Sequence, residues 1–417
     1  MVSLVTKLSY SEVMAIQSGR IKKNGKHFDG MQAFYLNALM RSMVFAMVGI
    51  FTPLYIYELM LPMTGSMSGA IMSVATYYLI IRVTTLLVDI KAAKVIERIG
   101  FRWSVMTSIG MLAIYLYSLM MAEHGYYYLI VAAVMMGLSI PFYWIARGSV
   151  IAIDSRKSQV GKQVAWLSVL ERVAGVLGPI SAGLMIERWG FPSVYMASGI
   201  ILLLSAVPIF SMPHHIHRNG VSLKGYLYWL HDSRFFHQAV GSIAGAIDDY
   251  GLNIVWPLVI FLMGIGYTSL GGVFSFITAI TIVVRYVSGV YFDKLYKKRG
   301  LEDEVMFSIA AIGTSLAWLV RLFVGSVSGV LILDGGTSIF GTTWRNLRGD
   351  YDVIGGKRMH EIAYYTYKQM TYSIGVIMVC LMWIVGAKYG VWKEIIFVSA
   401  SLWTLLSIVQ ARESNLK

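Results

Sequence analysis

The sequence is poor in charge for its length. Only 14% of its 417 residues are Asp, Glu, Lys or Arg, whereas an ordinary soluble domain has about 25% because its surface must face water. Hydrophobic residues make up 57% of the chain, and its mean hydropathy is +0.65. This composition excludes a soluble protein and predicts a chain that lies almost entirely within a lipid bilayer.

Cysteines and catalytic motifs are nearly absent as well. The single cysteine, Cys380, lies in a hydrophobic run, which excludes an internal disulfide and a thiolate metal cluster. His214, His215 and His217 have no carboxylate or cysteine at ligand spacing, so no metal site and no cofactor are expected. The sequence contains no phosphate-binding loop, nucleophile elbow or zinc-protease helix. We therefore expect neither an ATP-driven pump nor an enzyme.

What is present is a regular series of apolar runs. A membrane-spanning helix needs about 20 predominantly apolar residues, and six such runs, a polar stretch and six further runs follow one another. The runs lie near residues 33–58, 66–92, 103–122, 126–152, 163–186, 193–212, 237–263, 268–292, 305–324, 327–344, 361–386 and 392–411. We predict an all-α polytopic membrane protein of 12 transmembrane helices in two six-helix bundles. The expected parts are a tail (1–30), a first bundle (31–212), a linker (213–234), a second bundle (235–411) and a second tail (412–417).

The basic residues indicate how the chain is oriented. It has 35 Lys and Arg against 22 Asp and Glu, a net charge of +13. By this segmentation 25 basic residues lie in the two tails and in the loops after spans 2, 4, 6, 8 and 10, whereas three lie in the opposite loops. Cytoplasmic loops concentrate Lys and Arg, so we expect both termini in the cytoplasm and the protein in the plasma (inner) membrane. The basic excess then reflects topology, and no nucleic-acid partner is expected.

A short motif recurs within the first half. Residues 96–101 (IERIGF) reappear as residues 186–191 (IERWGF), 90 residues further on. This spacing corresponds to three spans with their loops, and because three is odd the two copies end on opposite sides of the membrane. Such inverted 3+3 repeats are typical of secondary transporters. The alternative is a chance match between two helix ends that are each followed by a turn.

Two longer motifs resemble those of the major facilitator superfamily. The loop after the second span resembles the family's Gly-x-x-x-Asp-Arg/Lys-x-Gly-x-Arg, with two conservative departures, at Ala93, Glu97, Arg98, Gly100 and Arg102. The equivalent loop of the second half has Gly289, Asp293 and Lys294. The fifth span resembles Gly-x-x-x-Gly-Pro-x-x-Gly-Gly at Ala174, Gly178, Pro179, Ala182 and Gly183. With the arrangement of six spans, a linker and six spans, the resemblance covers nearly the whole chain and implies the family's fold and its transport by alternating access.

The resemblance also implies a gate. In the family the loop motif holds the cytoplasmic side closed in the outward-open state, and the gating residues implied here are Glu97, Arg98, Gly100, Arg102, Asp293 and Lys294. The alternative is that these residues only anchor the loops on the cytoplasmic side and have no switching role. Gly178 and Pro179 are expected to kink the fifth span and to let neighbouring helices approach closely. In the family this element is associated mainly with antiporters, which favours efflux. The alternative is that it only serves packing where the two halves meet.

Charged residues inside the spans are the candidates for chemistry, because each costs about 2.5–3.5 kcal/mol at a helix centre unless it faces a cavity or a partner. Asp248 and Asp249 lie near the middle of the seventh span, and adjacent positions are about 100° apart on a helix. We therefore expect one to face the transport pathway and the other an interhelical partner. The candidates for proton coupling are Asp248, Asp249, Asp334 and Glu171, with a structural ion pair as the alternative.

Basic residues outnumber acidic ones in this set of intramembrane charges, which favours an anionic or anion-bearing solute. For Arg82, Arg285 and Arg321 the alternative to lining the cavity is that their side chains extend to the membrane interface. Tyrosines at the start of the eleventh span offer hydroxyl groups and rings, although an interfacial belt is the commoner role of such residues. The substrate-binding candidates are Arg41, Arg147, Arg172, Asn37, Trp256, Tyr364, Tyr367 and Lys368.

These features predict a secondary active transporter that moves a small organic solute by alternating access with proton coupling. Its expected partners are the solute, H⁺ and the lipid bilayer, and the expected state is a monomer. One alternative is a multidrug/proton antiporter, which the fifth-span motif favours and a cationic cavity disfavours. The other is a receptor or scaffold that keeps the fold without transport, which would be expected to lose its intramembrane charges.

Overall fold

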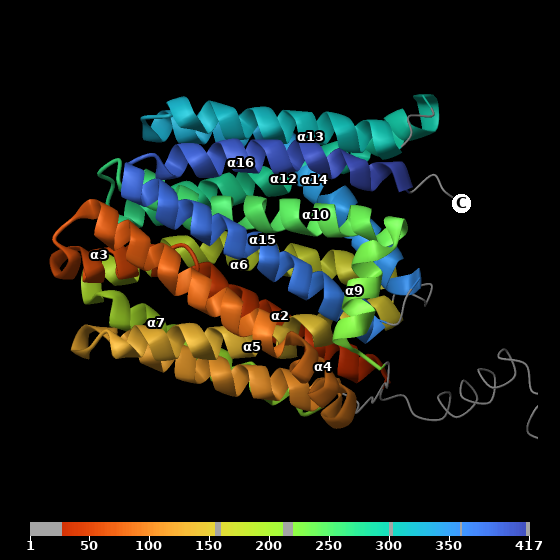
Figure 1. Ribbon diagram of the computed structural model, residues 1–417, viewed down its shortest axis with the longest axis horizontal. Helices are drawn as coiled ribbons and strands as arrows, with labels where there is room; N and C mark the ends of the chain where they lie inside the picture. Colours follow the sequence, from red (N-terminus) through yellow and green to blue (C-terminus); the bar gives the residue numbers. More distant parts are fainter. Residues whose placement is uncertain (1–26, 155–159, 212–219, 300–302, 359–360, 414–417) are drawn as a thin grey trace, which may run out of the picture.

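The structure is a computed structural model that describes residues 27–154, 160–211, 220–299, 303–358 and 361–413. Within these residues the chain forms helices and no strand. Figure 1 shows the long helices packed side by side along one direction of the molecule. The expectation of an all-α fold is confirmed.

The first half contains six spans in seven helices. They are α2 (His27–Val48), α3 (Thr52–Thr64), α4 (Met67–Met120), α5 (Tyr127–Asp154), α6 (Val160–Trp189), α7 (Phe191–Leu204) and α8 (Ala206–Ile209). A short break separates α2 from α3, and Pro53 is at the start of α3, where its missing N–H costs nothing. The 54-residue α4 holds two spans that turn at Gly100, whose φ of 77° favours glycine.

A short helix, α9 (Leu223–His231), lies in the linker before the second half. The helices that follow are α10 (Ser233–Tyr250), α11 (Trp256–Phe261), α12 (Tyr267–Arg299), α13 (Asp303–Val320), α14 (Val327–Arg358), α15 (Glu361–Tyr389) and α16 (Trp392–Leu406). A π-helical segment, Gly251–Val255, joins α10 to α11 directly after Asp249 and Tyr250. Such irregular turns are frequent at functional sites.

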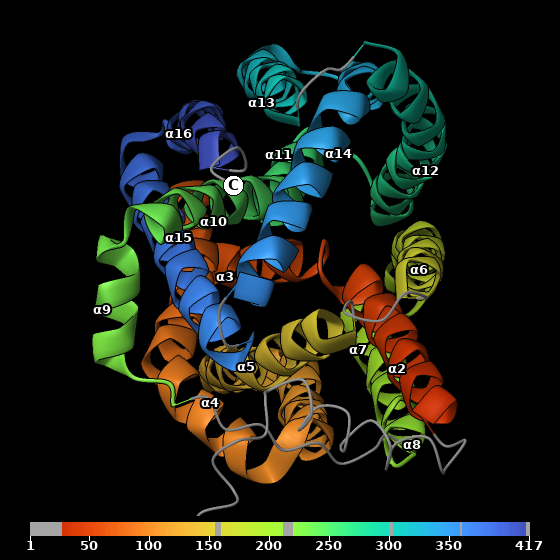
Figure 2. The same cartoon turned by 90° about the vertical axis from the view of Figure 1, so that its right-hand side faces the viewer.

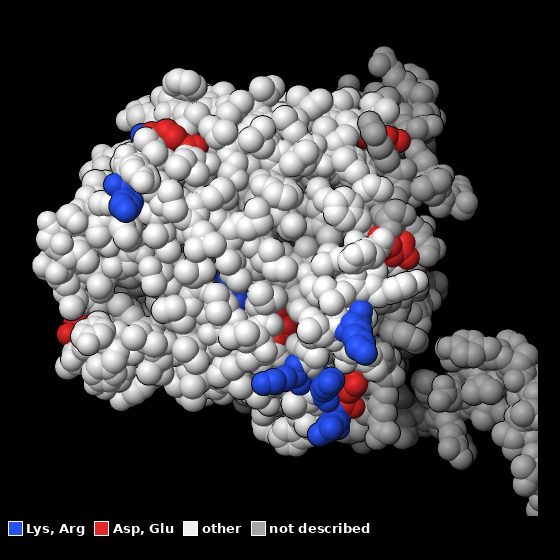
Figure 3. Space-filling view, in the orientation of Figure 1, with Lys and Arg blue, Asp and Glu red and all other residues white. Residues whose placement is uncertain are grey.

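Nine helical segments of the described chain are long and apolar enough to cross a membrane. One of these segments, α4, holds two spans. The helices α6 and α14, with 30 and 32 residues, are not among the nine segments and each provides one further span. Together these elements account for the twelve expected spans. On the face shown in Figure 3, the broad middle is almost free of charged side chains among the described residues, and the charges gather toward the two ends. The chain is an integral membrane protein.

The helices form two groups, which we call the N-half (α2–α8) and the C-half (α10–α16). Figure 2 shows the N-half below and the C-half above, with α9 at the outer edge. Between the halves, α6 packs on α12, and α4 and α5 pack on α15. The end of the molecule that carries α9 and the C-terminus is called the linker face, and the opposite end, which carries α3, is called the far face (Figure 1).

Candidate functional site

A cavity of about 380 Å³ lies between the halves, in the part of the molecule nearer the linker face. Helices of both halves line it. The lining residues are Arg82, Trp144, Arg147, Gly148, Ser242, Asp249, Arg348, Gly349, Tyr365, Lys368, Gln369 and Tyr372. Four of them are basic and one is acidic. Arg147 and Lys368, two of the predicted substrate contacts, are therefore brought together with Asp249, a predicted proton carrier.

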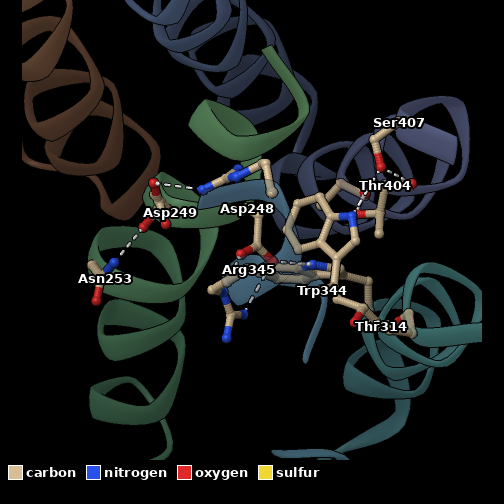
Figure 4. Close-up of polar contacts among 12 residues, drawn as sticks. Asp248, Asp249, Asn253, Thr314, Trp344, Arg345, Thr404 and Ser407 are labelled. Atoms are coloured by element: carbon tan, nitrogen blue, oxygen red, sulfur yellow. Dashed lines mark hydrogen bonds and ion pairs between the residues drawn. The ribbon is translucent and has the colours of Figure 1, made fainter. Parts of the chain in front are cut away.

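The two adjacent carboxylates face different ways, as expected from their spacing. Asp248 is fully buried, accepts a hydrogen bond from the Trp318 indole at 3.0 Å and lies 2.7 Å from Nε of Arg345. The side chain of Asp249 is 33% exposed and lines the cavity. Figure 4 shows Asp248 pointing toward Arg345, while Asp249 lies apart from them. The structure thus places Asp249 on the cavity and Asp248 against an interhelical partner.

Asp249 belongs to a polar network that joins the two halves. Its Oδ2 accepts a hydrogen bond from the Tyr372 hydroxyl at 3.1 Å and lies 3.7 Å from Nη2 of Arg348. Arg82 of the N-half donates through Nε to the Tyr250 hydroxyl at 2.6 Å, and its guanidinium lies 5.0 Å from the centre of the Tyr372 ring. Because Tyr372 contacts both groups, it connects Arg82 with Asp249 across the cavity.

A second cavity of about 250 Å³ adjoins the first within the N-half. It is lined by Arg41, Ser42, Phe45, Tyr143, Trp144 and Arg147, of which Trp144 and Arg147 also line the main cavity. Arg41 is 3% exposed, stacks 3.7 Å from the centre of the Tyr143 ring and donates through Nη1 to Ser108. Its Nε has no hydrogen-bond partner among the described residues. A buried guanidinium with an unused donor is suited to bind an anion.

Asp334 and Trp256 form a cluster inside the C-half, away from both cavities. Asp334 forms a buried ion pair with Arg321 and accepts a hydrogen bond from the Trp256 indole at 2.8 Å. Arg321 and Arg82 are both less than 10% exposed. The alternative that these two arginines extend to the interface is therefore wrong, because interior partners offset the cost of burying them. The side chain of Arg285 lies outside the described residues.

Three other substrate candidates are absent from the described linings of both cavities. Asn37 donates to the carbonyl and hydroxyl oxygens of Ser205 at 2.9 and 3.1 Å, which ties α2 to the junction of α7 and α8. The Tyr367 hydroxyl donates to the carbonyl of Ser222, at the start of α9. Tyr364 is buried and does not line either cavity. These three residues fit packing positions, and their proposed roles in binding stay predictions.

Several candidates are only partly described. Arg172 of α6 is half-buried and lies outside both cavity linings. The side chains of Glu171, Asp293 and Lys294 fall outside the described residues, although the helix backbone at these positions is described.

The predicted gate at the linker face is a glycine turn beside the linker. Gly100 has φ 77° and ψ 169° between the two spans of α4. Glu97 and Arg98 line a separate cavity of about 480 Å³ together with Lys94 and the linker residues Gly220 and Val221. Arg102 lies 5.6 Å from the centre of the Phe210 ring. The motif therefore sits where the N-half meets the linker.

The fifth-span motif lies where α6 approaches its neighbours most closely. A Cβ atom added at Gly178 would lie 2.5 Å from Cβ of Ala46 in α2, so glycine is required for this approach. A Cβ atom added at Gly271 of α12, in the other half, would clash with the carbonyl oxygen of Pro179. Small residues thus let α6 contact helices of both halves, as the motif predicts.

The halves also meet at the far face. The ring of Phe191 lies edge-on to that of Tyr267, with their centres 5.2 Å apart. The Ser68 hydroxyl donates to the carbonyl of Ala387, which joins α4 to α15. A Cβ atom at Gly183 would lie 2.5 Å from the carbonyl oxygen of Tyr267. The two halves are therefore in close contact at the end opposite the main cavity.

Sequence reasoning missed four charged or polar residues of this region. Arg345 and Arg348 were expected to lie beyond the tenth span, but α14 continues to Arg358 and holds both. Their spacing of three places them on one side of the helix, which was the available signal. Asp89 was also missed, although it lies in an apolar run. It is fully buried, and neither carboxylate oxygen has a hydrogen-bond partner in the part of the chain that the structure describes. The fourth is Tyr372.

Comparison with known proteins defines the class. The sequence profile of the Major Facilitator Superfamily matches residues 32–352. The chain belongs to this family and is therefore a secondary transporter, not an enzyme.

Two solved structures show the same fold. The Escherichia coli fucose:proton symporter has a TM-score of 0.63 at 11% identity, over 92% of this chain and 97% of that chain. A bacterial homologue of the iron transporter ferroportin, in its inward-facing state, has a TM-score of 0.61 at 15% identity, over 92% and 98% of the two chains. No curated protein sequence matches the chain.

Proposed function

We propose that this protein transports a small organic anion together with a proton, through the cavity between its two halves. The observation that carries the proposal is the pairing of Asp249 with Arg348 in a cavity whose described lining has four basic residues and one carboxylate. Cations in a cleft with low-dielectric walls attract and hold an anion. The same charges disfavour the cationic drugs expected of a multidrug antiporter. A non-transporting scaffold would have no need of them.

The coupling follows from the shared arginine. While Asp249 is ionised, Arg348 has a carboxylate beside it at 3.7 Å. Protonation of Asp249 removes that negative charge, so that Arg348 becomes a stronger partner for the carboxylate or phosphate of a solute. Binding of the proton and of the anion then favour each other, since such linkage is reciprocal. This order of events makes the protein a symporter.

Tyr372 and Arg82 extend this coupling to the other half. Tyr372 donates to Asp249 and lies against the Arg82 guanidinium. A change in the charge of Asp249 therefore reaches the N-half through one side chain. In this way occupancy of the site biases the relative position of the halves, which is the requirement for alternating access.

The conformation is proposed to be inward-facing. The cavity lies toward the linker face, and the halves are in close contact at the far face. The distribution of basic residues in the sequence assigns the linker face, with both termini, to the cytoplasm. The far face is then the outer side of the plasma (inner) membrane, and the working unit is one chain.

Binding and proton-driven transport test the proposal separately. A library of small carboxylates, phosphate esters, neutral analogues and amines is screened by thermal shift, because a bound solute raises the melting temperature. Only anions are expected to stabilise the protein, and more strongly at low pH. In proteoliposomes, an inward proton gradient should accumulate the best anion. Asp249→Asn should abolish that accumulation but leave exchange of labelled for unlabelled anion intact.

Asp248→Asn is the control, because Asp248 is adjacent in sequence but does not line the cavity. It is expected to lower stability while keeping proton-driven accumulation in the protein that remains folded. Accumulation by Asp249→Asn with the parent's pH dependence would rule out Asp249 as the proton carrier. Stabilisation by amines alone would overturn the anion assignment.

A further inference from the structure

The two copies of the internal repeat adopt the same turn. Gly100 has φ 77° and ψ 169°, and Gly190 has φ 74° and ψ 174°. Each glycine follows a helix end with the sequence Ile-Glu-Arg and precedes a new helix that starts with Phe. The match in backbone angles shows that the repeat is structural, with one copy at each face of the molecule. The second copy therefore provides a carboxylate, Glu187, at the far face.

Glu187 crosses from the N-half to the start of a C-half helix. Its Oε1 accepts a hydrogen bond from the backbone N–H of Thr268 at 2.9 Å, and its Oε2 accepts one from the Thr268 hydroxyl at 2.7 Å. Thr268 is the second residue of α12. The first N–H groups of a helix have no partner within it and carry a partial positive charge. Glu187 thus caps a helix that belongs to the other half.

We propose that Glu187 is a gating residue of the transport cycle, a latch that holds the far face closed while the linker face gives access to the cavity. This inference rests on the proposed alternating access. The contact can exist only while α6 and α12 meet at the far face, because its two partners come from different halves. When the halves separate there, the Thr268 N–H and hydroxyl lose the carboxylate. The latch therefore stabilises one state of the cycle and not the other.

The repeat predicts a reciprocal pair of latches. Glu97 occupies the equivalent position at the linker face, where it now lies beside Gly220 and Val221 of the linker. The family resemblance assigns Glu97 to closure of that face. Removing Glu187 should therefore open the far face, and removing Glu97 should not. The two glutamates have opposite effects on one equilibrium.

A crosslinking assay in detergent tests the latch without a transport measurement. Ser68→Cys and Ala387→Cys introduce a cysteine pair where α4 contacts α15 at the far face, and the native Cys380 is buried. A short bis-maleimide crosslinks the pair only while that face is closed. Because Glu187→Ala removes the acceptor of both Thr268 donors, it should lower the ratio of closed to open far face and slow crosslinking by up to about tenfold. Glu187→Gln keeps one acceptor and should have an intermediate effect.

Glu97→Ala in the same cysteine background is the matched control, and it should crosslink at least as fast as the parent. A Glu187→Ala protein that crosslinks at the parent's rate, while its melting temperature shows that it is folded, overturns the latch. If addition of a transported anion also fails to change the rate in every variant, the alternating access itself is overturned. An anion-dependent rate with no effect of Glu187→Ala overturns the latch alone.

Discussion

The two halves of the molecule stabilise the arginines within their spans in different ways. In the C-half, Arg321, Arg345 and Arg348 each lie beside an aspartate. In the N-half, Arg41 and Arg82 contact rings and hydroxyl groups, with no ion-pair partner among the described residues. A ring face stabilises a cation without neutralising it. The N-half therefore keeps positive charge for an anionic solute, while the C-half balances its charges and provides the carboxylate that takes up the proton.

The largest effect is expected from breaking a C-half ion pair. Arg321→Leu leaves Asp334 as an uncompensated buried carboxylate, which costs about 3–5 kcal/mol. The melting temperature in detergent should fall sharply. The double variant Arg321→Leu with Asp334→Leu should recover most of the loss, because it removes both charges. If the double variant is no more stable than Arg321→Leu, the charge pair is not the cause.

A smaller and different effect is expected from an N-half arginine. Arg41→Gln removes the charge of the second cavity while leaving no carboxylate unpaired. Hydrogen bonds to charged groups are worth about 1.5–3 kcal/mol, so the affinity for the transported anion should fall at least about tenfold. The melting temperature without anion should change little. Binding is measured by titration calorimetry; an unchanged affinity would show that the anion does not reach the N-half cavity.

The far-face latch extends the comparison to pH. The hydrogen bonds from the N–H and hydroxyl of Thr268 lower the pKa of Glu187 below its ordinary value. The contact is therefore fully present above the ordinary carboxyl pKa and is lost as the pH falls through the lowered value. The crosslinking rate of the Ser68→Cys, Ala387→Cys pair falls with pH in every variant, because the thiolate is the reacting form. Divided by the rate of the Glu187→Gln protein at the same pH, it should show an additional fall only in the acidic range of Glu187 protonation. A ratio that stays constant through that range would show that Glu187 ionisation does not hold the contact.

The smallest effect is expected at Asp89, the buried carboxylate of the N-half. Because neither of its oxygens accepts a hydrogen bond from any described residue, Asp89→Asn is expected to break no such contact. Its melting temperature should stay equal or rise, with a change in stability within about 1 kcal/mol. Asp248→Asn weakens the contacts with Arg345 and Trp318 and should lower the melting temperature. Equal losses in both variants would show that Asp89 has a partner of comparable strength.

Much of the fold followed from composition and periodicity. Apolar runs of sufficient length predicted the helices, since backbone groups in lipid must be satisfied within each segment. The different directions of Asp248 and Asp249 followed from the angle between adjacent helix positions. The tenth span was cut short, because Arg345 and Arg348 look like a polar loop until their aspartate partners are known. Hydropathy sums treat each charge alone and cannot include a partner from another helix.

The sequence by itself therefore determined the helices, the two halves, the repeated Ile-Glu-Arg turn and the presence of charges that needed partners. Only the tertiary structure decided which partners they have. It placed Asp249 rather than Asp248 on the cavity, joined Arg82 to it through Tyr372, and set Glu187 on the first turn of α12. The reason is physical: helix formation in a membrane depends on local backbone bonding, whereas charge pairing depends on side chains that are far apart in the chain and meet only when helices pack.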